Sequence, residues 1–447
     1  MKVDWERVGS ETVERLQAII RFDTTNPPGN ELPLALYLDG SLRDEGIETT
    51  LIKIPENRAQ LIARIRGSGT KRPVILLAHM DVVTVERERW TCDPFAAEVT
   101  DGYLYGRGAI DDKGMLAANL MTMILLKRIL AQSGRILSRD VVFVATADEE
   151  AGGEWGMGWL AEHHPDMLEA EFALNEGGRT RIIGEGRTYL AVQSAEKVSH
   201  VVTVTAHGNA GHAAIPLPDN AIFRLGRALE QLSRYEEPVV LTDLTRSFFA
   251  RLAGIWPNET EKEAMLDLAR ADGVSMDRPA AVLSLIPVFN AVLRNGISPT
   301  VIDGGRQFNV IPDSAGAVLN VRTLPGQSID DVAKRIRTVI TEPGVTVEIT
   351  QRGAEAPASQ PESDMFNAIA DATRELDPKI AVVPYLSTGM TDSARLRRLG
   401  VQAYGILPFP MTESDERRMH GHDERIPIES LLFGTRLIFS AISRIAR

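Results

Sequence analysis

The stretch Val74-Ile-Leu-Leu-Ala-His79-Met-Asp81 decides the class of fold, because an apolar run ends abruptly in a histidine and an aspartate. A short apolar run of this kind is typical of a strand that is buried on both faces. His79 and Asp81 are two residues apart, so their side chains share one face of the extended chain. The stretch therefore predicts a buried strand that delivers polar side chains to one edge of a sheet.

The same pattern continues outward along the chain. Further short apolar runs, Leu61–Ile65, Val141–Thr146 and Phe172–Leu174, are separated by helical stretches, and Gly114–Ala131 is long and apolar enough to form a buried helix. Strands that alternate with helices build a sheet that is covered by helices on both faces. The sequence therefore predicts an α/β fold.

The pattern changes near Val198, and Val198–His207 alternates between apolar and polar as a half-buried strand does. The helices and strands that follow suggest a small α+β unit, and helix–strand alternation resumes after a linker at Ala354–Gln360. We predict an α/β domain made of residues 1–196 and 354–447, interrupted by an inserted α+β domain at residues 197–353.

Composition and charge exclude several classes of protein. The formal net charge of −12 over 447 residues argues against nucleic acid as a main partner, because phosphates need a basic surface. The single cysteine, Cys92, excludes an intramolecular disulfide framework. Met1–Leu16 lacks the regions of a signal peptide, and no apolar run approaches the roughly 18 residues that span a bilayer. We therefore expect a cytoplasmic protein without a membrane partner.

A glycine-rich loop offers two carboxylates to a ligand. The stretch Gly106-Arg-Gly-Ala-Ile-Asp111-Asp112-Lys-Gly114 must bend tightly, and both acids emerge from it. A phosphate-binding loop is the alternative interpretation, but the stretch lacks the Gly-Lys-Ser/Thr ending and its acids would repel phosphate. A metal site fits this loop better.

The strand predicted at Val141–Thr146 ends in the consecutive acids Asp148, Glu149 and Glu150. Neighbouring side chains of an extended chain point to opposite sides. Glu149 and Glu150 can therefore take different roles, one on a metal and the other facing a substrate as a base. A solvated acidic turn is the structural alternative.

Two more motifs supply side chains that can bind a metal. Glu176 follows a short apolar strand, and His420 and His422 lie together in a polar loop near the C-terminus. Open α/β sheets place ligand sites at the carboxyl ends of their strands. Histidine with carboxylates suits zinc or a similar divalent ion. The candidate metal ligands are His79, Asp111, Glu150, Glu176 and His420.

These motifs resemble those of the dinuclear metallopeptidases, which include aminoacylase, acetylornithine deacetylase, succinyl-diaminopimelate desuccinylase, and carboxypeptidases of the glutamate-releasing and yeast vacuolar types. The resemblance runs from Thr24 to Glu424 and rests on an ordered series of motifs. The series is His79-x-Asp81, Gly106-Arg-Gly-x-x-Asp111-Asp-Lys-Gly114, Asp148-Glu-Glu150, Glu176-Gly-Gly178 and His420-Gly-His-Asp-Glu424.

The resemblance implies a central mixed sheet flanked by helices and two divalent metal ions, zinc first, with cobalt or manganese as alternatives. It assigns His79, Asp111 and Glu176 to one ion, with Asp111 bridging to a second ion that Glu150 and His420 complete. It further implies that Asp81 orients His79 and that Glu149 is the general base.

The inserted segment resembles the family's lid, which is also its usual dimerisation domain. The resemblance implies a homodimer in which His212 reaches the neighbouring protomer's active site and polarises the scissile carbonyl. It also implies substrate-binding roles for Asn309 and Arg322 of the lid, and for Thr388 and Gly389 of a loop that lines the pocket.

The predicted function is metal-dependent hydrolysis of an amide or peptide bond next to a free carboxylate in a small substrate, of carboxypeptidase or dipeptidase type. An N-acyl amino acid amidohydrolase, such as an aminoacylase, deacetylase or desuccinylase, is the alternative. A non-catalytic binding protein with the same fold is a remote alternative, because such a protein would usually have lost a ligand or the base.

Overall fold

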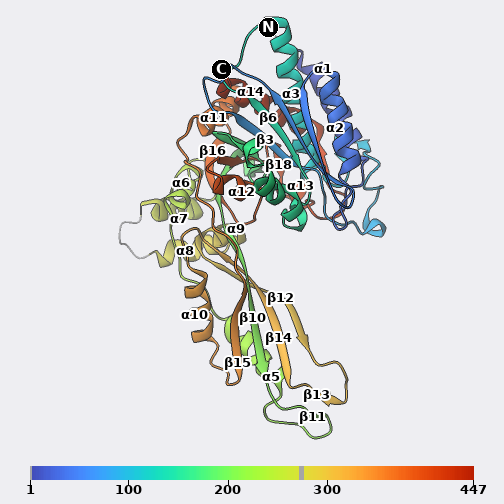
Figure 1. The fold of residues 1–447 in the computed structure, drawn as a ribbon. Coiled ribbons are helices and arrows are strands. Elements are labelled where there is room, and N and C mark those ends of the chain that lie inside the picture. Colours follow the sequence, from blue (N-terminus) through green and yellow to red (C-terminus); the bar gives the residue numbers. More distant parts are fainter. Residues whose placement is uncertain (1–2, 271–275) are drawn as a thin grey trace.

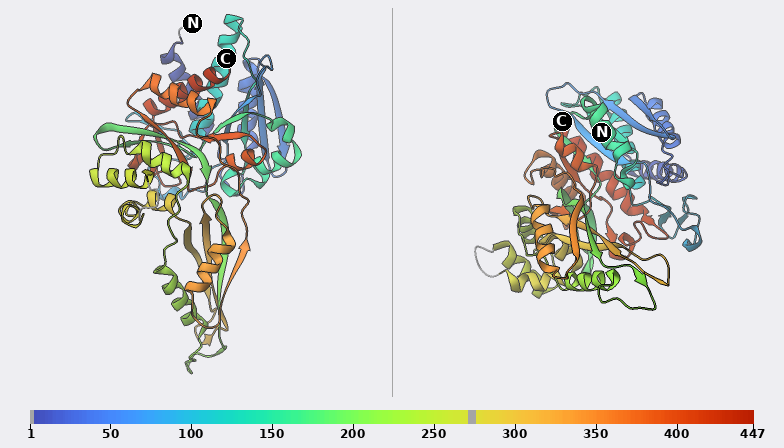
Figure 2. Two further views of the ribbon diagram at one scale, coloured as in Figure 1. Left: turned by 90° about the vertical axis from the view of Figure 1, so that its left-hand side faces the viewer. Right: turned by 60° about the horizontal axis from the view of Figure 1, so that its bottom comes forward.

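The computed structural model describes residues 3–270 and 276–447. They form a broad body around a large sheet and a narrower extension around a small sheet (Figures 1 and 2). The chain passes between the two parts near residues 197 and 353, and again within residues 234–242 and 294–295.

The large sheet has ten strands in the order β1-β2-β6-β3-β7-β17-β9-β8-β18, with β16 paired to β9. Its centre is parallel, since β3 pairs with β6 and β7 in parallel, whereas β1, β2 and β8 make antiparallel pairs. The sheet is therefore mixed, as predicted. Its strands are β1 (Glu48–Ile54), β2 (Arg58–Ile65), β3 (Val74–His79), β6 (Val141–Thr146), β7 (Phe172–Asn175), β8 (Arg179–Ile183), β9 (Arg187–Glu196), β16 (Ala381–Ser387), β17 (Gln402–Gly405) and β18 (Met411–Thr412).

Helices cover both faces of this sheet. On β3, Val74, Leu76 and Ala78 face one apolar cluster, while Ile75 and Leu77 face another. This alternation confirms that the opening stretch is a strand buried on both sides. The helices of the first face are α1 (Trp5–Ile20), α2 (Leu32–Asp44), α3 (Lys113–Ser133), α11 (Asp364–Leu376) and α14 (Ile428–Ile445), and those of the second are α4 (Trp159–His163) and α12 (Ser393–Arg398).

Helix α3 is long and apolar enough to cross a membrane by length and composition alone. The sequence analysis predicts a buried helix at Gly114–Ala131, and α3 confirms it, although the same analysis counted no apolar run of membrane-spanning length. In the structure 72% of its most apolar window is buried, and it packs against α1, α14 and β3. It is therefore the core helix of the body.

The extension contains an antiparallel four-stranded sheet in the order β12-β14-β10-β15, covered by α5 and α10. A two-stranded ribbon, β11 with β13, lies at its far end (Figure 1). The elements of the extension are β10 (Val198–His207), β11 (Gly211–His212), α5 (Ala221–Ser233), β12 (Gly296–Gly304), β13 (Val310–Ile311), β14 (Ser314–Thr323), α10 (Ile329–Val339) and β15 (Val345–Gln351).

Four helices within the predicted interval 197–353 pack elsewhere. Their apolar residues, among them Phe249 and Phe289, form one cluster with Tyr189 of β9 and Tyr385 of β16, so these helices cover the end of the large sheet. The predicted interval thus contains two parts with different packing. The helices are α6 (Asp243–Leu252), α7 (Glu259–Arg270), α8 (Asp277–Ser284) and α9 (Pro287–Leu293).

The remaining short elements lie beside the body. A three-stranded sheet joins β4 (Val99–Thr100) and β5 (Tyr103–Tyr105) to β19 (Arg425–Pro427). Helix α13 (Glu413–Glu416) follows β18. The sheet fixes the segment after residue 420 against the segment before residue 106.

Candidate metal centre

The candidate ligands come from neighbouring strand ends. His79 is the last residue of β3, Glu149 and Glu150 lie in the turn that follows β6, and Glu176 follows β7. Because β3 is parallel to β6 and β7, these three ends meet at one edge of the sheet. Asp111 and His420 reach the same edge from the loops before α3 and after α13.

Asp111 lies between two histidines. Its Oδ1 is 2.9 Å from Nε2 of His79, and its Oδ2 is 3.1 Å from Nε2 of His420. Nε2 of His420 is also 3.2 Å from Oε1 of Glu150. One carboxylate that presents its two oxygens to two separate ligand groups has the geometry that a bridge between two ions requires.

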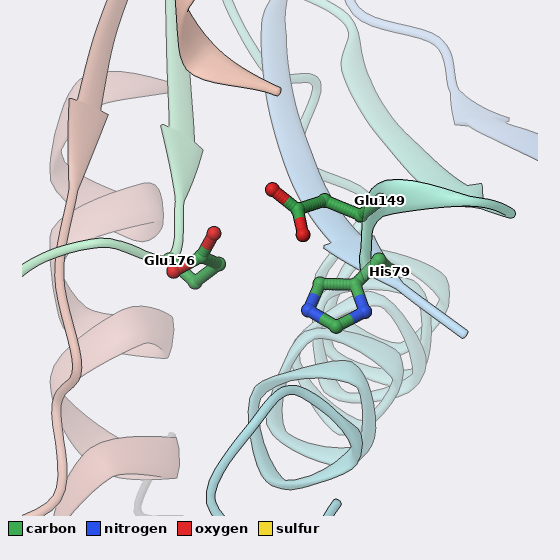
Figure 3. A group of neighbouring side chains, drawn as sticks. All are labelled: His79, Glu149 and Glu176. Carbon is green, nitrogen blue, oxygen red and sulfur yellow. The ribbon is translucent and has the colours of Figure 1, made fainter. Parts of the chain in front are cut away.

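His79 also belongs to two groups of possible ligands. Ligand atoms of His79, Glu149 and Glu176 lie within 4.8 Å of one another, as do those of His79, Asp111 and Glu150. Figure 3 shows the imidazole of His79 and the carboxylates of Glu149 and Glu176 facing a common space. The structure thus groups His79 with Glu149 and Glu176 and also with Asp111 and Glu150, while His420 lies beside Asp111 and Glu150. The ligands gather at one place, but Glu149 stands in the group where the resemblance puts Asp111.

Asp81 is completely buried, and it contacts both the imidazole of His79 and the turn that carries Glu149 and Glu150. Nδ1 of His79 lies 3.0 Å from the backbone oxygen of Asp81 and 3.5 Å from its Oδ1. The two carboxylate oxygens of Asp81 accept the backbone N–H groups of Glu149 and Glu150, each at 3.1 Å. Asp81 therefore fixes the turn after β6 in addition to the imidazole. The turn itself requires a left-handed backbone at Asp148, whose φ is 66°.

The carboxylates of this cluster disfavour one another's charge. Burial raises the pKa of Glu149 and of Glu176 well above the ordinary range, and neighbouring carboxylates raise both further. For Asp111 burial also acts upward, but the hydrogen bonds from His420 and His79 lower its pKa. Several enclosed acids that repel one another, beside two imidazoles, form a donor set that a divalent cation would neutralise. The residues present therefore fit a metal centre.

Glu424 holds the glycine-rich loop and was not singled out as a site residue from the sequence. Its buried carboxylate accepts the N–H groups of Gly108, Ile110 and Asp111 at 3.0, 2.8 and 3.1 Å, and Nη1 of Arg107 donates to it at 2.6 Å. The signal in the sequence is its position four residues after His420. Glu424 ties the loop of Asp111 to the loop of His420.

Asn26 and Arg58 form a second support that the sequence analysis missed. Nδ2 of Asn26 donates to Asp81 at 2.8 Å and to Asp148 at 3.1 Å. Nη1 of Arg58 lies 3.0 Å from both Asp148 and the buried Glu31. Asn26 belongs to a cluster of turn formers, which concealed its role, and Arg58 carries no motif.

A cavity of about 790 Å³ opens beside the cluster. Four of the five candidate ligands line it, all but His79, and so does the predicted base Glu149. The predicted substrate-binding residues Arg322, Thr388 and Gly389 line it as well. His212 and Asn309 do not line it. They lie at the exposed far end of the small sheet, where His212 belongs to β11 and Asn309 directly precedes β13 (Figure 1).

Histidine and carboxylate side chains gathered at the strand ends of an α/β sheet, facing a polar cavity, define a metal-dependent hydrolase. The comparison of the sequence with known families specifies which one. Residues 75–444 match the profile of peptidase family M20/M25/M40, and the chain belongs to this family. The predicted resemblance and the predicted class of enzyme are therefore confirmed.

Three curated proteins to which the chain is similar span related activities. They are a carboxypeptidase S-like protein of Dictyostelium discoideum (28% identical over 80% of this chain and 69% of that protein), an N-fatty-acyl-amino acid synthase/hydrolase of Xenopus tropicalis (27%, over 82% and 72%) and aminoacylase-1 of Sus scrofa (24%, over 97% and 95%). Both predicted readings, carboxypeptidase or dipeptidase and aminoacylase, are compatible with these relatives.

Solved structures share the fold. They include an M20 metallo-carboxypeptidase of Sulfolobus solfataricus (TM-score 0.71, 19% identical, over 97% of this chain and 99% of that one), human carnosine dipeptidase 1 (0.69, 16%, over 100% and 99%) and a dinuclear metal-binding M20 peptidase of Bacillus subtilis (0.62, 16%, over 99% and 100%). They confirm the predicted α/β fold with its central mixed sheet.

Proposed function

We propose that the protein hydrolyses the amide bond between an acyl group and an amino acid whose carboxylate is free. The observation that carries this proposal is that one cavity is lined both by the cluster of acids and histidines and by Arg322. Such a cavity suits the carboxypeptidases, dipeptidases and aminoacylases of the family.

Arg322 has a free donor for the substrate carboxylate. Its Nε donates to Oδ1 of Asn320 at 3.0 Å, whereas its Nη1 is enclosed and has no hydrogen-bond partner among the described residues. A guanidinium with an unused N–H binds a carboxylate with strong directional preference. We assign the substrate carboxylate to Arg322, with Thr388 and Gly389 beside it in the cavity wall.

His79, Asp111 and Glu176 would hold one divalent ion, and Asp111, Glu150 and His420 a second, with zinc as the proposed metal and cobalt or manganese as alternatives. When bound, such ions acidify a water molecule and polarise a carbonyl oxygen. The imidazoles and carboxylates present here are the ligands of open, catalytic zinc sites. The backbone oxygen of Asp81 holds Nδ1 of His79, and its carboxylate holds the turn of Glu150, in place for this purpose.

Glu149 is proposed as the general base. It lies beside His79 and Glu176 and lines the cavity, so its carboxylate faces the space in which the amide carbon must lie. Glu149 takes the proton of the attacking water and then delivers it to the leaving nitrogen.

We further propose that the active form is a homodimer through the extension. The exposed apolar side chains of α5 and of the adjoining face of β12, with the loop beyond them, form a candidate contact surface, made of Ile222, Phe223, Ile302 and Phe308. An exposed apolar group of this kind marks an interaction site. Pairing would account for the position of His212 and Asn309 far from their own cavity, because the partner subunit's cavity would then receive them.

A second candidate within this proposal is an N-acyl amino acid substrate. Two of the similar proteins bear names that refer to acyl amino acids, namely the Xenopus hydrolase and aminoacylase-1.

The experiment is a hydrolysis screen of zinc-loaded protein against dipeptides, N-acetyl amino acids and N-lauroyl amino acids, with release of the free amino acid as the readout. We expect hydrolysis that requires the free carboxylate, so the matched carboxamides should react far more slowly. Failure to hydrolyse any of these amides with metal bound would refute the proposal, and equal rates on acids and carboxamides would remove Arg322 from it.

A further inference from the structure

A second cavity, of about 570 Å³, lies at the end of the large sheet and has no part in the function proposed above. It is bounded by strands β8 and β9, by the segment between α6 and α7, and by helices α9 and α13. Gly184, Pro257 and Pro287 in its wall are exposed, so the cavity opens to solvent. A small molecule can therefore enter it without passing the metal centre.

Much of the wall of this cavity is aromatic or aliphatic. The ring centroids of Trp256 and Phe289 are 5.2 Å apart, and Tyr189 belongs to the same apolar cluster as Phe289. The other apolar lining residues are Ile182, Ile183, Pro257, Ile286, Pro287 and Val288. Such a wall favours a ligand with an apolar or aromatic group that leaves water on binding.

A guanidinium with unused donors lines the same cavity. Arg181 of β8 pairs directly with Tyr189 of β9, so the two side chains stand next to each other on one face of the sheet. Nε of Arg181 donates to Oε2 of Glu416 at 2.8 Å, whereas its Nη1 and Nη2 donate no hydrogen bond to a described residue. Only 18% of this side chain is exposed. A largely enclosed guanidinium with free N–H groups is suited to bind a carboxylate.

The charges around Arg181 do not balance. Glu416 provides one carboxylate for two guanidiniums, because its Oε1 also lies 2.8 Å from Nη1 of Arg179. Arg417 and Glu413, the other charged residues of the lining, pair with each other at 2.6 Å. The wall near Arg181 therefore carries an excess positive charge, which one bound anion would neutralise.

We propose that this cavity is a binding site for a small apolar monocarboxylate without an ammonium group. Its carboxylate pairs with the Nη groups of Arg181, and its apolar part packs against Trp256 and Phe289. A neutral molecule would leave the excess charge unmatched. An ammonium group would find no unpaired carboxylate in the lining, because Glu413 is already paired with Arg417.

The site is separate from the metal centre. Arg179 and Glu416 line the metal-site cavity, and their ion pair stands between it and Arg181. The inference therefore does not depend on the proposed hydrolysis, and a ligand bound here need not reach the scissile amide.

The direct test is isothermal titration of the zinc-loaded protein with 3-phenylpropionate. Its amide, 3-phenylpropionamide, should bind about 10-fold or more weakly, because it lacks the charged hydrogen-bond acceptors. Propionate should also bind about 10-fold or more weakly, because it lacks the ring. Phenylalanine, which adds only an ammonium group to the same skeleton, should bind more weakly than 3-phenylpropionate. Absence of binding, or equal affinities for the acid and its amide, would overturn the inference, and tighter binding of phenylalanine would overturn the ligand class.

Two variants locate the binding site. Val288→Trp fills the cavity, and Arg181→Met removes the guanidinium, so each should weaken binding of 3-phenylpropionate about 10-fold or more. The matched controls are Leu285→Trp and Arg187→Met, because both residues are exposed and lie outside the cavity lining. Both controls should bind like the parent. Thermal unfolding shows which variants are folded, and Val288→Trp with the amide still decides the question if Arg181→Met does not fold.

The competing outcome is a carboxylate bound to metal. Binding that is lost on chelation of zinc but survives Val288→Trp would place 3-phenylpropionate at the metal centre and overturn the inference. Binding that survives chelation and is lost in Val288→Trp would support it. The titration measures binding without turnover, so its result is distinguishable from success or failure of the hydrolysis screen.

Discussion

Asp81 shows how much of the centre depends on single buried side chains. It contacts the imidazole of His79 and also accepts the backbone N–H groups of both glutamates in the turn after β6. A change at this residue therefore moves a metal ligand and the proposed base together. Substitutions meant to test chemistry alone should leave Asp81 in place.

Replacing the proposed base tests its role directly. In Glu149→Gln we expect kcat to fall by about 10²–10⁴-fold, because the variant cannot take the proton of the attacking water. Bound metal, measured per chain by atomic emission, should stay within about 20% of the parent, since Glu149 is not among the proposed ligands. Substantial residual turnover with metal bound would assign the base elsewhere.

Lys197 gives a prediction about stability and pH. Burial, and then the nearby Arg322 guanidinium, lower the pKa of Lys197 to about 8. Between about pH 8 and 10.4 the unfolded chain still holds this proton and the native chain does not, so the stability contributed by Lys197 rises with pH.

Relative to Lys197→Met, the parent should therefore gain up to about 3 kcal/mol in free energy of unfolding across that range. Urea unfolding of both proteins at several pH values measures the difference, in which other titrating groups cancel. A difference that is independent of pH would show that Lys197 keeps an ordinary pKa in the native protein.

At the scale of elements, the loop of Asp111 depends on a residue more than three hundred positions away. Glu424 accepts N–H groups from three residues of that loop and pairs with Arg107. In Glu424→Gln we expect metal affinity to fall about 10–100-fold, because a residue that supports a ligand has been altered. The control is Asp423→Asn, because the Asp423 side chain accepts the N–H of Thr91 and, among the described residues, no N–H of the Asp111 loop. Competition with a chelator measures both, and equal affinities would reduce Glu424 to a structural role.

The strands that position the centre could be predicted because their residues form short apolar runs, and β6 and β10 have the predicted bounds. The helices α6–α9 could not be assigned to the large sheet. Their apolar residues predict that one face of each helix is buried, but they do not identify the element that covers it. A contact residue such as Tyr385 lies far along the chain. Supports such as Arg58 were missed for the same reason, since burial next to Asp148 is a property of the fold.

At the scale of the whole molecule, the exposed apolar surface of the extension predicts assembly. Ile302 on β12 is 69% exposed, and in Ile302→Glu we expect a monomer by sedimentation velocity, because a buried charge at the contact is costly. Turnover should fall with the dimer if the partner subunit's His212 is needed. Leu285→Glu, also at an exposed apolar residue, should leave the assembly unchanged. A parent that is monomeric and fully active would refute the dimer proposal.

Removal of metal should loosen the body as a whole, because the ligands come from three strand ends and two loops. A ligand that binds only the native state stabilises it by about 4 kcal/mol at a thousandfold excess over Kd. We therefore expect chelation to lower the unfolding temperature by several degrees, and zinc to restore it. An unchanged unfolding temperature would indicate that the cluster holds no ion.

The distribution of the ligands along the chain also sets an order of events during synthesis. A ribosome that has completed 400 residues has produced four of the proposed ligands, while His420 and the Glu424 that secures Asp111 are still to be translated. The nascent protein should thus remain a poor zinc binder, and an idle hydrolase, until translation has passed this late segment.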